Sequence, residues 1–338
     1  MSHAAADTIV ARTRPPAKLN LFLELLARRD DGFHDIDTVM VPIDWRDELS
    51  LQRSSDTDIQ LRVQWLPSRE VIAQRLGIET DGPQAAALLD IPADESNLVH
   101  RALSRFRDTF NIAGGFRCQL DKRIPAGAGM GGASSDAASA LQCAAKLNGI
   151  PLGAPELYDI AAEIGSDVPF FLGATPSNPH ETVTPEPMDA ARATGRGERL
   201  EAFRLAAPLH FVVVFPGISL STAKVYANSH VPPSPQTASG LIAALEGGEP
   251  SDFGATMTNR LADPAKKLAP QIGEILESLW QADLRTCQLT GSGSACFAIA
   301  SSPTEAQRCV NKLRAMHEPG AIVMSTQSTQ VPARIDVT

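Results

Sequence analysis

The chain has 338 residues and a formal net charge of −9; 43% of its residues are hydrophobic and 20% are charged. This composition is ordinary for a folded enzyme, and the length is sufficient for a sizeable core and two domains. The lack of a lysine- and arginine-rich run argues against a nucleic-acid partner. No apolar run reaches the roughly 20 residues that span a membrane. Five scattered cysteines without a C-x-x-C pair are typical of reduced thiols, so we expect a cytoplasmic protein.

The sequence predicts mainly strands in the first third of the chain. Apolar or alternating runs predict strands over 17–27, 33–43, 47–52, 58–65 and 115–125. Residues 93–110 have helical spacing instead, with Asp94 or Ser96 as the expected N-cap.

Two helices and a loop-like stretch follow. Residues 134–149 predict a helix capped by Ser134, Ser135 or Asp136, and a second helix ends at Gly165 before an apolar strand. Residues 175–205 contain a stretch rich in proline, threonine and polar residues, which predicts an inserted loop or linker. The second half predicts strands over 210–217, 285–289 and 321–325, with helices in 239–280 and 304–316.

Four glycines fall within residues 127–132, between a predicted strand and a predicted helix. A flexible linker would not be bracketed so tightly, whereas a strand–loop–helix unit presents free amides and a helix N-terminus to an anion. The Walker pattern is excluded because no lysine ends the loop, and the dinucleotide fingerprint fails because no acidic strand end follows about 20 residues later. The loop therefore predicts a phosphate site of another kind.

The segment "PAGAGMGGASSDAASAL" resembles the phosphate loop of the galactokinase, homoserine kinase and mevalonate kinase superfamily (GHMP kinases). "LTGSGSACFAIA" is similar to the second glycine motif of that superfamily, and "PAKLNLFLELLARRDDGFHDIDTVMVPID", "IGSDVPFFL" and "GRGERL" also match in order. The resemblance implies an α+β fold of two domains. The expected arrangement is an N-terminal domain like ribosomal protein S5 domain 2 over 1–174, a linker over 175–205 and a ferredoxin-like domain over 206–338. Two stretches, near 69–89 and 175–194, look longer than usual and are interpreted as surface insertions.

The resemblance implies ATP as the phosphoryl donor, with Mg²⁺ expected beside it and its ligands left open. Ser134 or Ser135 could offer a hydroxyl to a phosphate or to Mg²⁺, or could act only as a helix cap. The expected nucleotide-binding residues are Asn97, Lys122, Pro125, Ala126, Gly127, Ala128, Gly129, Met130, Gly131, Gly132, Ala133, Ser134 and Ser135.

Lys18 and Asp167 are the expected catalytic residues. An aspartate at this kind of junction is more often a turn former, but the superfamily places its catalytic aspartate here. A lysine inside an apolar strand needs a partner because an unpaired buried ammonium is costly, and Asp167 would supply one.

The opening segment resembles the branch of the superfamily that phosphorylates the 2-hydroxyl of a cytidine-diphosphate-linked methylerythritol, an isoprenoid precursor. The expected substrate-binding residues are Asn20, Phe33, His34, Thr222 and Tyr226, with Phe33 standing where tyrosine is usual. Two alternatives stay open: a superfamily kinase acting on mevalonate or homoserine, and a nucleotide-binding module without catalysis. The oligomeric state is not readable from the sequence.

Overall fold

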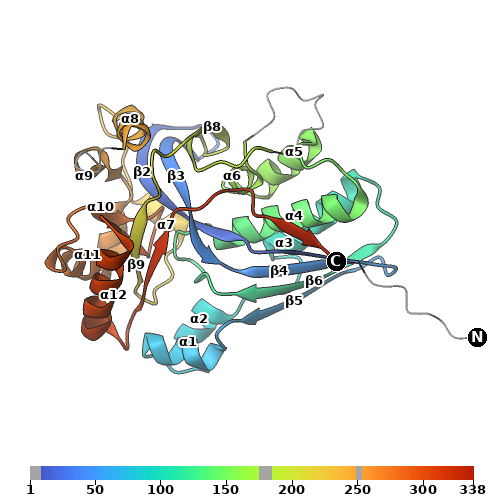
Figure 1. Ribbon diagram of the computed structural model, residues 1–338, viewed down its shortest axis with the longest axis horizontal. Coiled ribbons are helices and arrows are strands. Elements are labelled where there is room, and N and C mark those ends of the chain that lie inside the picture. Colours follow the sequence, from blue (N-terminus) through green and yellow to red (C-terminus); the bar gives the residue numbers. More distant parts are fainter. Residues whose placement is uncertain (1–8, 175–184, 249–252) are drawn as a thin grey trace, which may run out of the picture.

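The computed structural model describes residues 9–174, 185–248 and 253–338 (Figure 1). The strands are β1 (Val10–Thr13), β2 (Pro16–Arg28), β3 (His34–Arg46), β4 (Glu48–Ser54), β5 (Ile59–Trp65), β6 (Gly115–Lys122), β7 (Ala190–Gly195), β8 (Arg199–Phe203), β9 (His210–Phe215), β10 (Thr258–Asn259), β11 (Cys287–Leu289), β12 (Cys296–Ala300), β13 (Ile322–Gln327) and β14 (Ile335–Val337). The helices are α1 (Arg69–Leu76), α2 (Pro83–Leu89), α3 (Leu98–Thr109), α4 (Gly132–Asn148), α5 (Pro155–Ile164), α6 (Val168–Leu172), α7 (Thr222–Ala227), α8 (Ser239–Gly247), α9 (Phe253–Thr256), α10 (Ala262–Leu268), α11 (Gln271–Gln281) and α12 (Pro303–His317).

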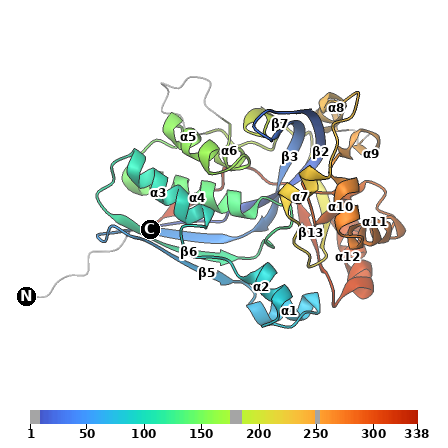
Figure 2. The same ribbon diagram turned by 180° about the vertical axis from the view of Figure 1, so that it is seen from behind.

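The first sheet has the order β14-β1-β4-β6-β5, and α3 to α6 lie together on one side of it (Figures 1 and 2). Helix α4 is buried along most of its length because alanines let it pack closely between the sheet and its helical neighbours. This packing fixes the direction of α4, whose N-terminus follows the glycine-rich loop.

The second sheet, β10-β2-β3-β7-β8, is built on the long antiparallel pair of β2 and β3. Residues 16–25 of β2 are all buried, which explains why this strand reads as an almost continuous apolar run. The few polar side chains in that stretch must therefore find partners inside the protein.

The third sheet is antiparallel with the order β11-β12-β9-β13, and α11 and α12 pack beside it (Figure 1). Two short strands of the second half return to the other sheets: β14 pairs with β1, and β10 pairs with β2. The expected α+β class is therefore present. Among the described residues, no helix combines the length and apolar character needed to cross a membrane.

Several expectations are wrong in detail. The predicted linker 175–205 contains β7 and β8, which extend the second sheet, while its residues 175–184 lie outside the described part of the chain. The stretch 69–89 is no mere surface insertion, because it forms α1 and α2 and buries Ile72, Leu76 and Leu88. The apolar segment after Asp167 is the short helix α6 and not a strand. The proposed domain limits at 174 and 206 stay a prediction.

Candidate active site

A cavity of about 1260 Å³ lies where the two glycine-rich loops, β2, the β2–β3 turn and α7 meet. Its lining contains nearly all the residues singled out from the sequence. These are Lys18, Asn20, Phe33, His34, Asn97, Lys122, all of Pro125 to Ser134, Asp167, Thr222 and Tyr226. Ser135 is the exception: it is fully buried, and its hydroxyl has no hydrogen-bond partner among the described residues.

The glycine-rich loop ends in the N-terminus of α4. Gly127, Gly129 and Gly131 have φ values of 65°, 76° and 70°, a left-handed conformation that glycine adopts without steric cost. Gly131 is the N-cap, and no described side chain caps the helix, so the predicted serine or aspartate caps are wrong. Because the first amides of an α-helix lack intrahelical acceptors, this terminus is suited to bind an anion.

The second glycine-rich loop, residues 290–295, supports the first one from behind. The amide of Ala295 donates to the carbonyl oxygen of Ala128 at 3.1 Å. A Cβ atom on Gly129 would lie only 2.3 Å from the carbonyl oxygen of Thr290. The two loops thus pack backbone against backbone, which requires a residue without a side chain at this position.

Replacing Gly129 by alanine should therefore weaken ATP binding by about tenfold or more, equivalent to at least about 1.4 kcal/mol. The added methyl group meets a backbone oxygen that cannot rotate away, so the loop must shift. The control is Gly149→Ala, where φ is also left-handed at 68° but nothing lies within 4 Å of the added carbon. Calorimetric titration with ATP, together with the melting temperatures, compares them. Equal ATP affinities for the two variants would contradict the proposed role of the loop contact.

Lys18 and Asp167 form an ion pair in the lining of the cavity. The Lys18 ammonium lies 3.5 Å from a carboxylate oxygen of Asp167, and the two side chains are 5% and 33% exposed. Lys18 also donates to the side-chain oxygen of Asn20, and the side-chain nitrogen of Asn20 donates to the Thr38 hydroxyl at 2.9 Å. Asp167 stands at the N-cap position of α6 but makes no capping hydrogen bond. Its carboxylate is therefore available to the cavity, which does not support the interpretation as a turn former.

An aromatic group lines another part of the cavity. The rings of His34 and Tyr226 lie 5.5 Å apart at 40°, while the Phe33 ring is 56% exposed with the Arg196 guanidinium 5.5 Å from its centroid. Burial, helped by the charge of Arg28, lowers the pKa of His34, so its imidazole is neutral near pH 7 with one donor and one acceptor.

Arg196 and Ser292 are two polar residues of the lining that were not predicted. Ser292 shares a 2.9 Å hydrogen bond with Thr222. Arg196 lies in "GRGERL" and Ser292 lies in "LTGSGSACFAIA", two segments that resemble the superfamily. The sequence therefore pointed to these segments but not to these individual side chains.

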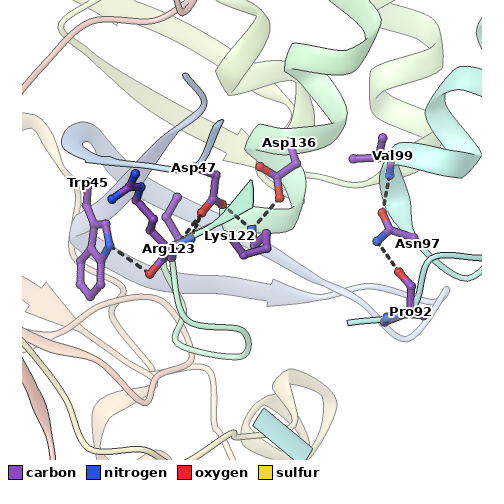
Figure 3. A network of polar contacts seen from close by, with 9 residues as sticks. Trp45, Asp47, Pro92, Asn97, Val99, Lys122, Arg123 and Asp136 are labelled. Atoms are coloured by element: carbon purple, nitrogen blue, oxygen red, sulfur yellow. Dashed lines mark hydrogen bonds and ion pairs between the residues drawn. The ribbon is translucent and has the colours of Figure 1, made fainter. Parts of the chain in front are cut away.

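Lys122 and Asn97 line the cavity but use their polar groups inside the protein (Figure 3). The buried Lys122 ammonium contacts the carboxylates of Asp47 and Asp136. Burial acts to lower the pKa of Lys122, but the two carboxylates outweigh it and raise the pKa above its usual value. Asn97 caps α3 by accepting from the Val99 amide at 2.9 Å, so the expected Asp94 or Ser96 cap is wrong. Neither polar group is free to bind a nucleotide in this arrangement.

Sequence comparisons identify both halves of the chain. Residues 97–174 match the GHMP kinases N terminal domain, and residues 241–318 match the GHMP kinases C terminal domain. The 4-diphosphocytidyl-2-C-methyl-D-erythritol kinase of Rhodopirellula baltica is 48% identical over 96% of this chain and 97% of its own length. The enzyme of the same name from Enterococcus faecalis is 32% identical over 90% of this chain and 95% of its own.

Structural comparison agrees. A crystal structure of 4-(cytidine 5'-diphospho)-2C-methyl-D-erythritol kinase superposes with a TM-score of 0.68 at 30% identity, covering 94% of this chain and 98% of the other. A homoserine kinase from Cytophaga hutchinsonii gives the same TM-score at 18% identity over 99% of this chain and 100% of its own, which shows a shared fold alone. The expected GHMP kinase fold is thus confirmed, and the chain is an ATP-dependent kinase that acts on a small molecule. It belongs to the 4-diphosphocytidyl-2-C-methyl-D-erythritol kinase family of the GHMP kinases.

Proposed function

We propose that this chain transfers the γ-phosphoryl group of ATP to the 2-hydroxyl of 4-diphosphocytidyl-2-C-methyl-D-erythritol. The observation that carries the proposal is the meeting, in one cavity, of an anion-binding loop, a lysine–aspartate pair and an exposed aromatic ring. The relatives at 30% identity or more that are named above carry the name of kinases for that substrate. In this chain one cavity of about 1260 Å³ contains groups that suit a phosphate, a hydroxyl group and a nucleobase.

Asp167 accepts the proton of the attacking hydroxyl in this proposal. The hydroxyl oxygen forms a bond to the γ-phosphorus while the bond from that phosphorus to the bridging oxygen breaks, and ADP leaves. The Lys18 ammonium, 3.5 Å from the carboxylate, offers positive charge to the oxygen that loses its proton. The loop amides and the α4 N-terminus stabilise the negative charge of the phosphates.

Mg²⁺ would neutralise phosphate charge during transfer. Within the described residues, no group of three or more histidine, cysteine, aspartate or glutamate side chains could hold a metal ion by itself. A metal bound together with the nucleotide needs fewer protein ligands. The Ser134 hydroxyl, in the first turn of α4 and in the cavity lining, is the side chain that we propose for contact with it.

Phe33, His34 and Tyr226 are the residues that we propose to bind cytosine. A base stacks on an aromatic face, and the exposed Phe33 ring supplies one. The neutral His34 offers a donor and an acceptor to the polar edge of the base, and its packing on Tyr226 holds it in place. A tyrosine hydroxyl at position 33 is not needed for stacking, which allows phenylalanine there.

Replacing Phe33 by alanine should raise the KM for the cytidylyl substrate, because about 1–3 kcal/mol of stacking is lost. The KM for ATP should stay unchanged, and Phe33→Tyr should keep the substrate KM. Trp280→Ala is a matched control, because Trp280 is also about half exposed and has an arginine over its ring, but lies outside the cavity. Steady-state kinetics with each substrate varied in turn measure this. If the Phe33→Ala enzyme keeps the parental KM for the cytidylyl substrate, the cytosine is bound elsewhere.

The proposed function is tested by measuring ADP formation with a panel of acceptors: the cytidylyl substrate, mevalonate and homoserine. We expect turnover with the first alone. Turnover with mevalonate or homoserine would favour another superfamily activity, and ATP binding without turnover would favour a nucleotide-binding module. The cytoplasmic location stays a prediction.

A further inference from the structure

A second pocket, of about 310 Å³, adjoins the active-site cavity at Pro125 but has no part in the reaction proposed above. Residues of helices α1 and α2 line it together with residues of β13 and with Arg314 of α12. The Gly320 amide donates to the Arg75 carbonyl oxygen at 3.0 Å, which ties α1 to the α12–β13 turn. The pocket is thus closed by segments from both halves of the chain.

The inner wall of this pocket is aromatic and apolar. Trp45 and Trp65 both line it, together with aliphatic side chains of α1 and α2. Their ring nitrogens donate to the carbonyl oxygens of Arg123 at 3.1 Å and Leu89 at 2.7 Å. The two indole rings are therefore held in place with their polar atoms satisfied, which leaves apolar ring surface for a ligand.

Arginine is the most frequent charged residue of the lining. Five arginines line the pocket, and Asp44 is the one acidic residue among the lining residues; the arginines are Arg14, Arg46, Arg75, Arg123 and Arg314. Three of them have carboxylate partners: Asp44 for Arg46, Glu48 for Arg123 and Glu318 for Arg314. The side chains of Arg14 and Arg75 have no hydrogen bond or ion pair within the described part of the chain.

This local positive charge runs against the net charge of −9 of the whole chain. Guanidinium groups bind phosphate in a planar, two-pronged geometry, while the indole rings and aliphatic side chains favour an apolar body. A volume near 300 Å³ is at the lower end of small-molecule sites. We propose that this pocket binds a small organic phosphate with an aromatic or other apolar body, with Arg14 and Arg75 as its free cations.

The site also has a physical connection to the phosphate loop. Pro125 lines both pockets. Trp45 binds the backbone of Arg123, whose amide donates to Asp47, a partner of Lys122 (Figure 3). A ligand in this pocket would therefore lie beside Arg123 and Pro125, at the start of the phosphate loop.

The test is calorimetric titration with 1-naphthyl phosphate, while the active site is saturated with a non-hydrolysable ATP analogue and the cytidylyl substrate. We expect one molecule to bind per chain, and 1-naphthol and inorganic phosphate each to bind at least tenfold more weakly. The double variant Arg14→Gln/Arg75→Gln should weaken 1-naphthyl phosphate binding by at least tenfold, because two charge-assisted contacts are lost.

The matched control is Arg53→Gln/Arg62→Gln, which removes two other exposed arginines outside this lining. It should leave binding unchanged, and melting temperatures check that both double variants fold. Three results would each overturn the proposal: no binding of 1-naphthyl phosphate, equal affinities for the two double variants, or binding that disappears when the active site is saturated. None of them bears on the proposed kinase activity, which is measured separately.

Discussion

Replacing Asp167 by asparagine lowers kcat by about 10²- to 10⁴-fold, the range for loss of a general base. The substitution keeps the size of the side chain but removes its negative charge and its capacity to accept a proton. The affinity for ATP should change little, because the phosphate loop and the α4 N-terminus are untouched. Steady-state kinetics for kcat and calorimetric titration with ATP separate the two effects.

Asp159→Asn is the control for this experiment, because Asp159 is exposed on the preceding helix α5 and lies outside the cavity. The Asp159→Asn enzyme should keep the parental kcat and the parental affinity for ATP. If Asp167→Asn retained kcat within a few-fold of the parent, another group would take the proton. The Lys18–Asp167 pair would then be a structural contact.

Replacing Lys122 by methionine lowers the free energy of unfolding by about 3–5 kcal/mol, the usual cost of removing one partner of a buried ion pair. Lys122 is 4% exposed, and its ammonium lies between the carboxylates of Asp47 and Asp136. Without it, two buried carboxylates face each other. Urea unfolding followed by circular dichroism measures the change.

The double variant Lys122→Met/Asp136→Asn distinguishes this cause from lost packing. Removing one of the two carboxylates should restore part of the stability, while Asp47 keeps its hydrogen bond from the Ile124 amide at 2.9 Å. The charges are not coupled if the double variant loses as much free energy of unfolding as the two single variants together. The structural role assigned to Lys122 would then be wrong.

Local sequence signals predicted the elements that build the site. The continuous apolar run of β2 predicted a buried strand, and the glycine cluster before an alanine-rich segment predicted a loop followed by a helix. Both signals depend on short-range chemistry: side-chain burial in one case, and left-handed backbone in the other. The cost of an isolated buried ammonium predicted that Lys18 has a partner, and the resemblance to the superfamily implied that this partner is Asp167.

Long-range contacts account for what the sequence did not predict. Ser134 and Ser135 suggested helix caps, but α4 begins before them and Gly131 is the N-cap, because the loop turns through left-handed φ values up to the helix. Lys122 seemed available to a nucleotide until the fold brought Asp47, 75 residues away, against it. Strand β7 pairs with the edge of β3, and β8 pairs with β7. No local sequence pattern predicted either strand.

Phosphorus-31 nuclear magnetic resonance of the reaction product tests the central claim most directly. The enzyme is incubated with ATP, Mg²⁺ and 4-diphosphocytidyl-2-C-methyl-D-erythritol, and the spectrum is followed over time. The proposal predicts equal amounts of ADP and of a new phosphate monoester on the tertiary 2-hydroxyl, with the diphosphate bridge intact. ATP that stays unconsumed, or a phosphate transferred to water or to another hydroxyl, would contradict it.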